Sequence, residues 1–344
     1  MSGLRGPGLP GKFAIGALAG LTGVAWWWAM TRRNTALVRP PIRDASGKAL
    51  PAATIEYSDG ETVEYVDVAS GDALVWVPGA DGPKETFRYQ LPRFARSHRV
   101  VCADLRREFA ADHGFDRLVD DVAELVDARN LDRFVLIGTS LGSAISLRFA
   151  SRFPERLRGL VLCNPVARVS YDHVGLNRAV LTPLAMATTR YLPTNLAREL
   201  ARSWSRLGVW IFDDSPGREA LIEYALFTGP RTVPPSVSDR RVGHLRKFDI
   251  LTDLGGITAP ALVVKGPHDV YCPVDWAMEI AELLPDAEYV PIPGTGHCSH
   301  ISRPGAFNEA LENWLRKLAE AQGARGTHGT PNPDHPHESD GGDA

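Results

Sequence analysis

The sequence contains little cysteine and little net charge, and both shortages exclude classes of protein. Only four of its 344 residues are cysteines, and their spacing matches no metal-binding motif, so we expect no metal site. The formal net charge is −3, which offers no excess of basic side chains for a polyanion. We therefore expect no nucleic-acid partner. The sequence also contains no pattern that requires a cofactor.

The segment 138–142, with the sequence Gly-Thr-Ser-Leu-Gly, is the most informative part of the chain. It follows an apolar run at residues 134–137 and precedes a helical pattern at residues 144–150. A strand, a sharp turn and a helix in this order lift the serine hydroxyl out of the sheet, and the glycines permit the tight backbone. The amides at the start of the helix face the same point. We therefore predict that Ser140 is a nucleophile.

A serine nucleophile needs a histidine base and a carboxylate that orients the histidine, and both follow later strands. Residues 260–265 read as a buried strand that leads to Asp269. Residues 287–292 read as the next strand, which leads to His297. The chain order of serine, aspartate and histidine is the order used on sheets of this kind. Asp269 and His297 are therefore the candidate partners of Ser140.

Three nearby polar residues are alternatives to these partners. We interpret His268 as a surface residue, because a tight loop would turn it away from its neighbour Asp269. His300 either lines the pocket or, as we favour, lies behind it or at the surface. Asn164 ends an earlier strand, but its amide carries no charge to balance an imidazolium.

At this point the chain resembles the capped serine-hydrolase branch of the α/β-hydrolase superfamily, over about residues 53–320. The resemblance rests on the segment around Ser140 and on several downstream matches: Phe248–Leu251, Ile257–Pro260, Gly266, Asp269, Gly296, His297, Arg303, Pro304, Phe307 and Asn308. It implies that Ser140 is the nucleophile, Asp269 the acid and His297 the base.

The resemblance also points to the two backbone amides of an oxyanion hole. One is the amide of Leu141, directly after the nucleophile. The other comes from the loop after the strand Ala73–Val77 and is Ala80 by position. Relatives usually have His-Gly in this loop, where this chain has Pro78-Gly79. Because the histidine normally steadies the loop, its absence leaves the geometry of the loop open, and a plain turn is the alternative.

The rest of the sequence predicts one α/β domain with additions. Alternating strands and helices indicate a mostly parallel sheet covered by helices on both faces. The hydrolase core then comprises residues 53–165 and 246–321, and a helical cap comprises residues 166–245. We interpret residues 34–52 as a linker and residues 322–344 as a disordered tail.

Two of the four cysteines follow the loops of the predicted acid and base. Cys272 comes shortly after Asp269, and Cys298 comes directly after His297. We favour free thiols at both positions, with a disulfide between them as the alternative.

The N-terminal region lacks acidic residues altogether, since the first acid is Asp44. Residues 13–30 also lack basic side chains and are long enough to cross a bilayer. Trp26–Trp28 lie at one end, where aromatic rings favour the membrane interface. We predict a single-pass membrane anchor over residues 1–33, with a cleaved signal peptide and a transit peptide as alternatives. Flanking basic residues favour a cytoplasmic catalytic domain.

Together these features predict a membrane-anchored serine hydrolase that cleaves a carboxylic ester, of a small molecule or an acyl lipid, through an acyl-enzyme. A peptidase or thioesterase of the same superfamily is one alternative. In a peptidase, Glu219 and Glu223 would contact the substrate amine. The other alternative is a non-catalytic interaction protein that kept the fold, for which Pro78 in the oxyanion loop is the best support.

Overall fold

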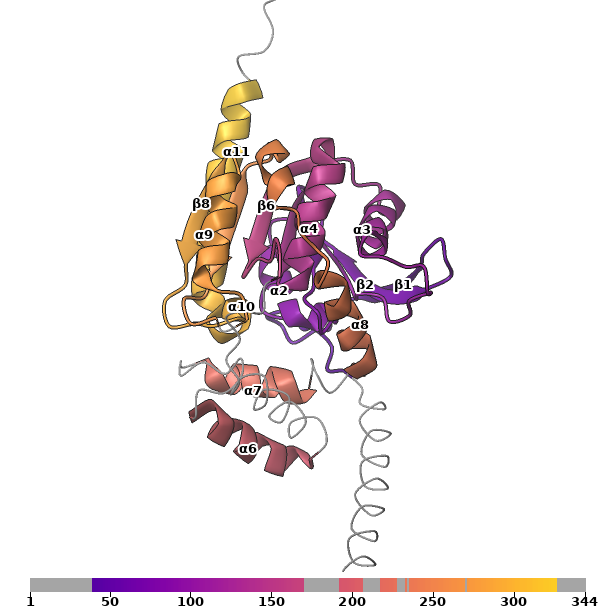
Figure 1. The fold of residues 1–344 in the computed structure, drawn as a ribbon, viewed down its shortest axis with the longest axis vertical. Helices are drawn as coiled ribbons and strands as arrows, with labels where there is room; N and C mark the ends of the chain where they lie inside the picture. Colours follow the sequence, from indigo (N-terminus) through magenta and orange to yellow (C-terminus); the bar gives the residue numbers. More distant parts are fainter. Residues whose placement is uncertain are drawn as a thin grey trace, which may run out of the picture.

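The computed structural model describes residues 39–169, 192–206, 217–227, 233, 235–269 and 271–326. Its centre is an eight-stranded sheet (Figure 1). The strands are β1 (Ala52–Glu56), β2 (Thr62–Val68), β3 (Ala73–Val77), β4 (Arg99–Ala103), β5 (Phe134–Thr139), β6 (Leu157–Cys163), β7 (Ala261–Lys265) and β8 (Ala287–Pro291).

The strands lie in the order β1-β2-β4-β3-β5-β6-β7-β8. β1 pairs with β2, and β2 with β4, in antiparallel fashion, and every later pairing is parallel. Parallel neighbours need a crossover between them, which explains why strands and helices alternate along the sequence. The predicted mostly parallel sheet is therefore confirmed.

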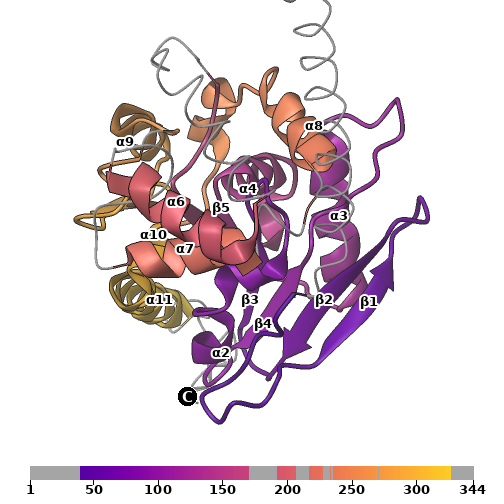
Figure 2. The same cartoon turned by 90° about the horizontal axis from the view of Figure 1, so that it is seen from below.

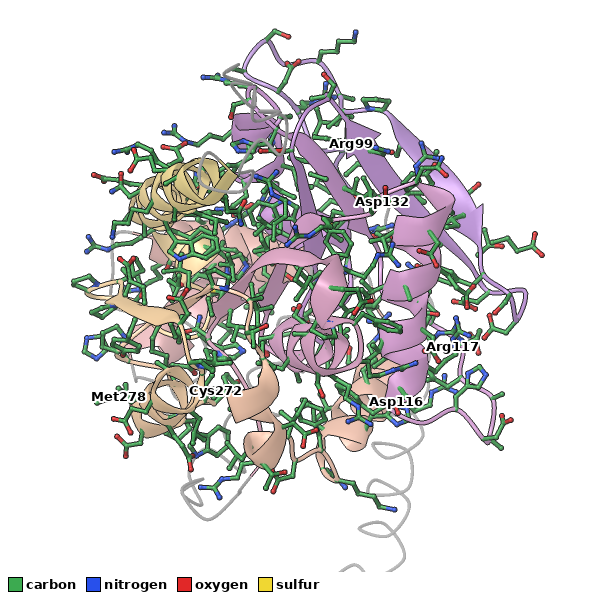
Figure 3. The ribbon with its side chains drawn as sticks, turned by 90° about the horizontal axis from the view of Figure 1, so that it is seen from above. Arg99, Asp116, Arg117, Asp132, Cys272 and Met278 are labelled. Atoms are coloured by element: carbon green, nitrogen blue, oxygen red, sulfur yellow. The ribbon has the colours of Figure 1, made fainter. Side chains whose placement is uncertain are left out.

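Helices cover both faces of the sheet (Figure 2). The longer ones are α3 (Asp116–Ala128), α4 (Leu141–Arg152), α6 (Thr194–Arg206), α7 (Arg218–Phe227), α8 (Pro235–Leu245), α9 (Val274–Leu283) and α11 (Pro304–Gly326). Short helical turns are η1 (Lys84–Phe87), α2 (Leu91–Phe94), η2 (Pro154–Arg156), η3 (Leu251–Gly256) and α10 (Ser299–Ser302). Figure 3 shows Asp116 and Arg117 at the start of α3.

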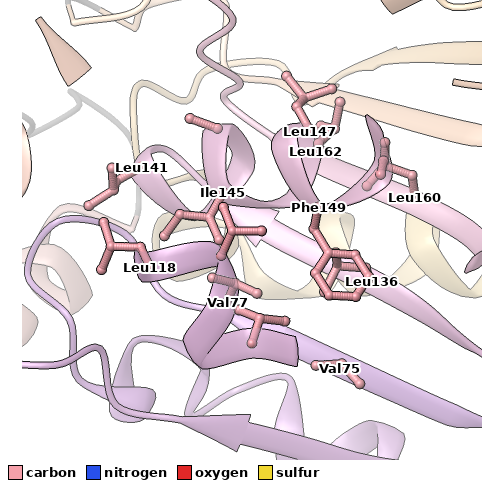
Figure 4. Close-up of a cluster of buried hydrophobic side chains, with 14 of the residues drawn as sticks. Val75, Val77, Leu118, Leu136, Leu141, Ile145, Leu147, Phe149, Leu160 and Leu162 are labelled. Atoms are coloured by element: carbon pink, nitrogen blue, oxygen red, sulfur yellow. The ribbon is translucent and has the colours of Figure 1, made fainter. Parts of the chain in front are cut away.

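Two apolar layers hold the helices to the sheet. One layer joins α3, α4 and α9 to the sheet, and Leu136 and Phe149 lie in it (Figure 4). The opposite layer packs η1, α2 and α11 on the other face, around Trp76 and Phe307. Every residue of β3 and β5 is buried. Burial on both faces explains why these strands read as continuous apolar runs.

In the described part of the chain, α6, α7, α8 and the short turn η3 lie between β6 and β7. Of these, α6 and α7 lie beyond the end of the sheet at which the parallel strands finish (Figure 1). α7 contacts α10, which directly follows the loop of His297. α6 and α7 share an apolar cluster that includes Ala197, Ala201 and Leu221, all fully buried. The assignment of residues 166–245 to a cap remains a prediction, because residues 170–191 and other parts of it lie outside the described residues.

The ends of the domain differ from the sequence-based boundaries. Residues 39–51 fall in the predicted linker, but Ile42 is buried and the guanidinium of Arg39 pairs with Glu64, Glu85 and Asp104. At the other end, α11 continues to Gly326, so its last turns lie inside the predicted tail. Residues 327–344 lie outside the described residues.

The predicted membrane anchor requires a correction. In the described part of the chain, no helix combines the length and the apolar character that a bilayer span needs. Residues 1–33, on which the prediction was based, lie outside the described residues. We therefore assign neither an anchor nor a side of a membrane to this protein.

Candidate active site

The turn between β5 and α4 carries Ser140 in a strained backbone conformation. Its φ is 53° and its ψ is −118°, a backbone conformation that residues other than glycine rarely adopt. A Cβ at Gly138 would lie 2.2 Å from the carbonyl oxygen of Gly142, and a Cβ at Gly142 would lie 2.2 Å from that of Val77. Only glycine fits at these two positions. The structure thus explains why both glycines flank the serine.

Replacing Gly142 should therefore disrupt the turn. We expect Gly142→Ala to destabilise the protein by about 1–3 kcal/mol or more, because the added methyl group meets backbone that cannot move aside. The control is Gly243→Ala on α8, where a Cβ would have no heavy atom within 4 Å. The control should leave stability unchanged or raise it by up to about 1 kcal/mol. Urea denaturation measures both, and equal stability of the two variants would contradict the account.

The three predicted catalytic side chains lie in hydrogen-bond contact. Ser140 Oγ is 2.9 Å from His297 Nε2, and His297 Nδ1 is 2.9 Å from Asp269 Oδ2. Ser140 follows β5, Asp269 follows β7 and His297 follows β8, so the set lies at the carboxyl ends of three parallel strands. A serine hydroxyl, an imidazole and a carboxylate in this sequence can move a proton from the hydroxyl to the imidazole.

The acid of this set has a second partner that the sequence did not reveal. Lys265, the last residue of β7, places its ammonium 2.5 Å from Asp269 Oδ2, and both side chains are fully buried. Lys265 also donates a short hydrogen bond to the carbonyl of Cys272. The other carboxylate oxygen accepts the amides of Tyr271 and Cys272. Asp269 is therefore fixed on both oxygens.

The charges at the site favour the ionised acid and the protonated base. Burial alone would raise the pKa of Asp269, but His297 and then Lys265 outweigh burial and hold this pKa well below its usual range. Burial alone would lower the pKa of His297, but the charge of Asp269, assisted by Cys272, raises it above its usual range. Asp269 thus favours its ionised form beside a protonated His297.

The raised pKa of His297 predicts the pH dependence of activity. Protonated imidazole cannot accept the proton of Ser140, so the rate should rise with pH as His297 loses its proton. The midpoint should lie above about 6.5, the value of a free imidazole. A profile of kcat/KM between pH 5 and 10, with a melting curve at each pH to verify folding, measures it. A midpoint at or below 6.5 contradicts the expected shift.

The three alternative residues take positions away from the reacting atoms. His268 is exposed, as predicted. His300 is buried, its Nε2 lies 3.2 Å from Thr86 Oγ1, and burial together with the charge of His297 lowers its pKa to about 3. Asn164 ties two loops together, because its amide donates to the carbonyl of His297 at 2.6 Å and accepts the amide of Gly266 at 2.9 Å. Its role is to hold the loops of the acid and the base.

All four cysteines are free, and Cys272 lies beside α9 (Figure 3). Asp269, Cys272 and His297 each offer a ligand atom within 4.8 Å of the others. A thiol, an imidazole and a carboxylate are suitable ligands for zinc. However, the ammonium of Lys265 already pairs with the carboxylate of Asp269, and its charge would repel a dication bound to the same carboxylate. The arrangement therefore fits an acid–base pair better than a metal site.

The two predicted oxyanion donors come from two separate segments near Ser140. Leu141 begins α4, and the loop of Ala80 follows β3, the strand beside β5. A Cβ at Gly79 would lie 3.5 Å from Ser140 Cβ, so this loop contacts the nucleophile. In the described part of the chain, neither the amide of Ala80 nor that of Leu141 donates a hydrogen bond. Both are available to an oxyanion.

Comparison with known proteins places this fold and site in a class. The model of the alpha/beta hydrolase family matches residues 74–310. The chain therefore belongs to the alpha/beta hydrolase family, and the resemblance stated from its motifs is confirmed.

The individual proteins that resemble this chain have low sequence identity to it. The chain is 26% identical over 270 residues to 2-hydroxy-6-oxo-6-phenylhexa-2,4-dienoate hydrolase of Burkholderia cepacia, which covers 72% of this chain and 89% of that protein. An esterase from Thermogutta terrifontis has a similar structure, with a TM-score of 0.59 and 24% identity over 78% of this chain and 99% of that one. A meta-cleavage product hydrolase from Pseudomonas fluorescens has a TM-score of 0.61 and 20% identity over 77% and 97% of the two chains. These two structures support the fold alone.

Proposed function

We propose that this hydrolase is a serine hydrolase that cleaves a carboxylic ester. The observation that carries the proposal is the unbroken chain of contacts from Ser140 Oγ through His297 to Asp269, with 2.9 Å at each step. Packing of the apolar core alone would not bring three polar side chains together in this way. The strained backbone of Ser140 adds support, because strain of this kind concentrates at reactive residues.

The first half of the reaction transfers the acyl group to the enzyme. Ser140 Oγ attacks the carbonyl carbon while His297 Nε2 takes its proton. Asp269, which faces Nδ1, fixes the tautomer and stabilises the imidazolium. The amides of Leu141 and Ala80 donate to the oxyanion of the tetrahedral intermediate. His297 then protonates the leaving alcohol, and the acyl group remains on Ser140.

The second half returns the enzyme to its starting state. Water loses a proton to His297 and attacks the acyl carbon. The oxyanion forms at the same two amides, and collapse of the intermediate releases the carboxylic acid. His297 returns the proton to Ser140. No group other than the side chains and amides already described is needed to balance the reaction.

The substrate that we propose is an ester of a small molecule. An acyl lipid was inferred mainly from analogy with the fold, with support from the membrane anchor, which is now withdrawn. The helices α6 and α7, which lie beyond the carboxyl ends of the strands, would cover the bound substrate. A peptidase loses support, because Glu219 pairs with Arg202 at 2.9 Å and Glu223 with Arg198 at 2.9 Å. These carboxylates are engaged and are not poised for a substrate amine.

A second candidate comes from the relatives. The similarity to a hydrolase of 2-hydroxy-6-oxo-6-phenylhexa-2,4-dienoate favours cleavage of a carbon–carbon bond next to a ketone. Such a reaction also develops an oxyanion beside Ser140 and ends with a released carboxylic acid. The two candidates therefore share a site and differ in the leaving group.

A two-substrate assay distinguishes these candidates. The purified protein is given p-nitrophenyl acetate and, separately, 2-hydroxy-6-oxo-6-phenylhexa-2,4-dienoate, and each reaction is followed by absorbance. We expect faster turnover of the ester, with kcat/KM in the usual enzymatic range of about 10⁴ M⁻¹s⁻¹ or above on a well-matched chain length. Preference for the dienoate would support the second candidate. A folded protein that turns over neither, nor any ester in a chain-length series, would support a non-catalytic interaction protein.

A further inference from the structure

The loop of the second oxyanion donor is held by a residue far away in the sequence. This loop, residues 78–82, begins with Pro78, where the resemblance implies a histidine that steadies the loop. In the structure the guanidinium of Arg241, on α8, lies directly against the loop. Its side chain is almost completely buried, with 1% of the residue exposed.

Arg241 uses every donor that it has. Its Nη1 donates to the carbonyls of Ala80 and Asp81, at 3.0 Å each. Its Nη2 donates to the carbonyls of Leu105 at 2.6 Å and Arg106 at 2.5 Å. Its Nε donates to Arg106 at 3.0 Å. A guanidinium has five N–H donors, and these five bonds account for all of them.

All of these acceptors are main-chain carbonyls, which is unusual for a buried arginine. Buried charges are normally paired with an opposite charge, because their desolvation is costly. Here burial lowers the pKa of Arg241 to about 10, and the side chain remains charged at neutral pH. Burial of this charge therefore costs stability, which indicates that Arg241 has a role besides packing. The loop that Arg241 binds indicates that role.

The bonds of Arg241 fix the direction of the Ala80 amide. The carbonyl of Gly79 accepts the amide of Gly82 at 2.9 Å, which closes a turn. In a trans peptide the C=O and the N–H point in opposite directions, so the Ala80 N–H points out of this turn. Arg241 holds the next two carbonyls, those of Ala80 and Asp81. The peptide that carries the Ala80 N–H is thus held through its own carbonyl and through the two peptides that follow it, which restricts its rotation.

The sequence of the loop is consistent with this arrangement. A Cβ at Gly82 would lie 2.1 Å from Arg241 Nη1, and the φ of Gly82 is +88°. Glycine is therefore required both by the backbone conformation and by the arginine. The loop also connects to the end of β4, because the amide of Leu105 donates to the carbonyl of Gly82 at 2.8 Å. Arg241 joins these two segments to α8.

We propose that Arg241 is a positioning residue that takes the place of the missing loop histidine and holds the Ala80 amide toward the oxyanion. The inference rests on the proposed function, since it assigns a role in the same reaction. It gives α8 a part in supporting the site through Arg241 alone. The affected step is stabilisation of the tetrahedral intermediate rather than substrate binding.

The test compares Arg241→Met with Arg240→Met, its exposed neighbour on α8. The readouts are kcat and KM for p-nitrophenyl acetate and the inhibition constant of an alkyl trifluoromethyl ketone, which forms an oxyanion on the serine. Loss of one oxyanion donor typically costs about 10²–10³-fold in kcat. We expect Arg241→Met to lose kcat in this range with little change in KM, and to weaken the ketone by a similar factor. Arg240→Met should match the wild type.

Chemical rescue separates positioning from packing. Arg241→Gly leaves a cavity of guanidinium shape, so guanidinium ion at low millimolar concentration should restore part of the lost kcat, while it leaves Arg240→Gly unchanged. Arg241→Lys, which keeps the charge and up to three donors, should retain more activity than Arg241→Met. Melting curves verify that each variant is folded at the assay temperature.

The outcomes are distinct. Folded Arg241→Met with wild-type kcat and wild-type ketone affinity overturns the inference. So does a loss of activity that follows only the unfolded fraction, or a failure of all three variants to fold, since each would make Arg241 a purely structural residue. A wild-type protein that hydrolyses no ester instead sinks the proposed function, and the inference with it.

Discussion

Ser140→Ala should abolish hydrolysis while the protein keeps its fold. Removal of the nucleophile from a serine, histidine and aspartate set typically lowers kcat by about 10⁴–10⁶-fold. The hydroxyl of Ser140 is within hydrogen-bond distance of His297 and of no other side chain among the described contacts, so its loss should not disturb packing. Steady-state hydrolysis of p-nitrophenyl acetate, with active-site concentration matched, measures the loss.

A matched control makes this result specific. Ser143→Ala removes a neighbouring hydroxyl on α4 that donates to the carbonyl of Ser140 and accepts the amide of Val166. It should cost stability through lost hydrogen bonds, by about 1 kcal/mol each, and retain most of the activity. A Ser140→Ala protein that retained activity within tenfold of wild type would contradict the assignment of the nucleophile.

Asp269→Asn should lose both activity and stability, and the two losses should be separable. An amide in place of the carboxylate no longer stabilises the imidazolium, so kcat should fall by about 10⁴-fold. The same change leaves the buried ammonium of Lys265 without its counter-charge, which should cost about 3–5 kcal/mol of stability. Activity assays and urea denaturation measure the two effects.

The double variant Lys265→Met/Asp269→Asn tests this separation. Removing the unpaired ammonium should restore most of the lost stability, because methionine fills a similar volume without a charge. Activity should stay low, because the imidazolium still lacks its partner. If the double variant were no more stable than Asp269→Asn alone, then the buried ion pair would not contribute as described. If it regained activity, Asp269 would not be the acid.

The three residues of the proposed catalytic set could be grouped from the sequence because their positions follow from local patterns. Ser140 is marked by glycines on both sides and by a strand and helix around it. Asp269 and His297 each follow an apolar run that reads as a strand, and parallel strands bring their carboxyl ends to one edge. Each of these signals lies within a few residues of the side chain that it identifies. Chain order was then enough to group the three.

The residues that support the site could not be predicted in the same way. Lys265 appeared to be the polar end of a strand, and only the structure shows that it is buried against Asp269. Its one signal in the sequence is a lysine that directly continues four apolar strand residues. Arg241 lies 136 positions from its acceptor Leu105, in a region with no clear pattern. Partners so far apart in the sequence are set by tertiary packing.

The membrane anchor was predicted from the length of an uncharged run, the tryptophans at its end and the basic residues that flank it. No helix in the described part of the chain fits a bilayer span, and an uncharged run of residues is compatible with several structures. The contacts of residues 39–51 with the rest of the domain were missed because the guanidinium of Arg39 meets acids from three separate segments. The sequence shows these four charges but not their proximity.

Labelling with a fluorophosphonate probe tests the central claim most directly, because the probe reacts only with a serine whose hydroxyl is activated. We expect the wild-type protein to be labelled once, with the adduct on Ser140 by peptide mass spectrometry. Ser140→Ala and His297→Ala, both folded, should remain unlabelled, and Gly243→Ala should be labelled like the wild type. A folded wild-type protein that stays unlabelled, or an adduct that persists in Ser140→Ala, would contradict the account.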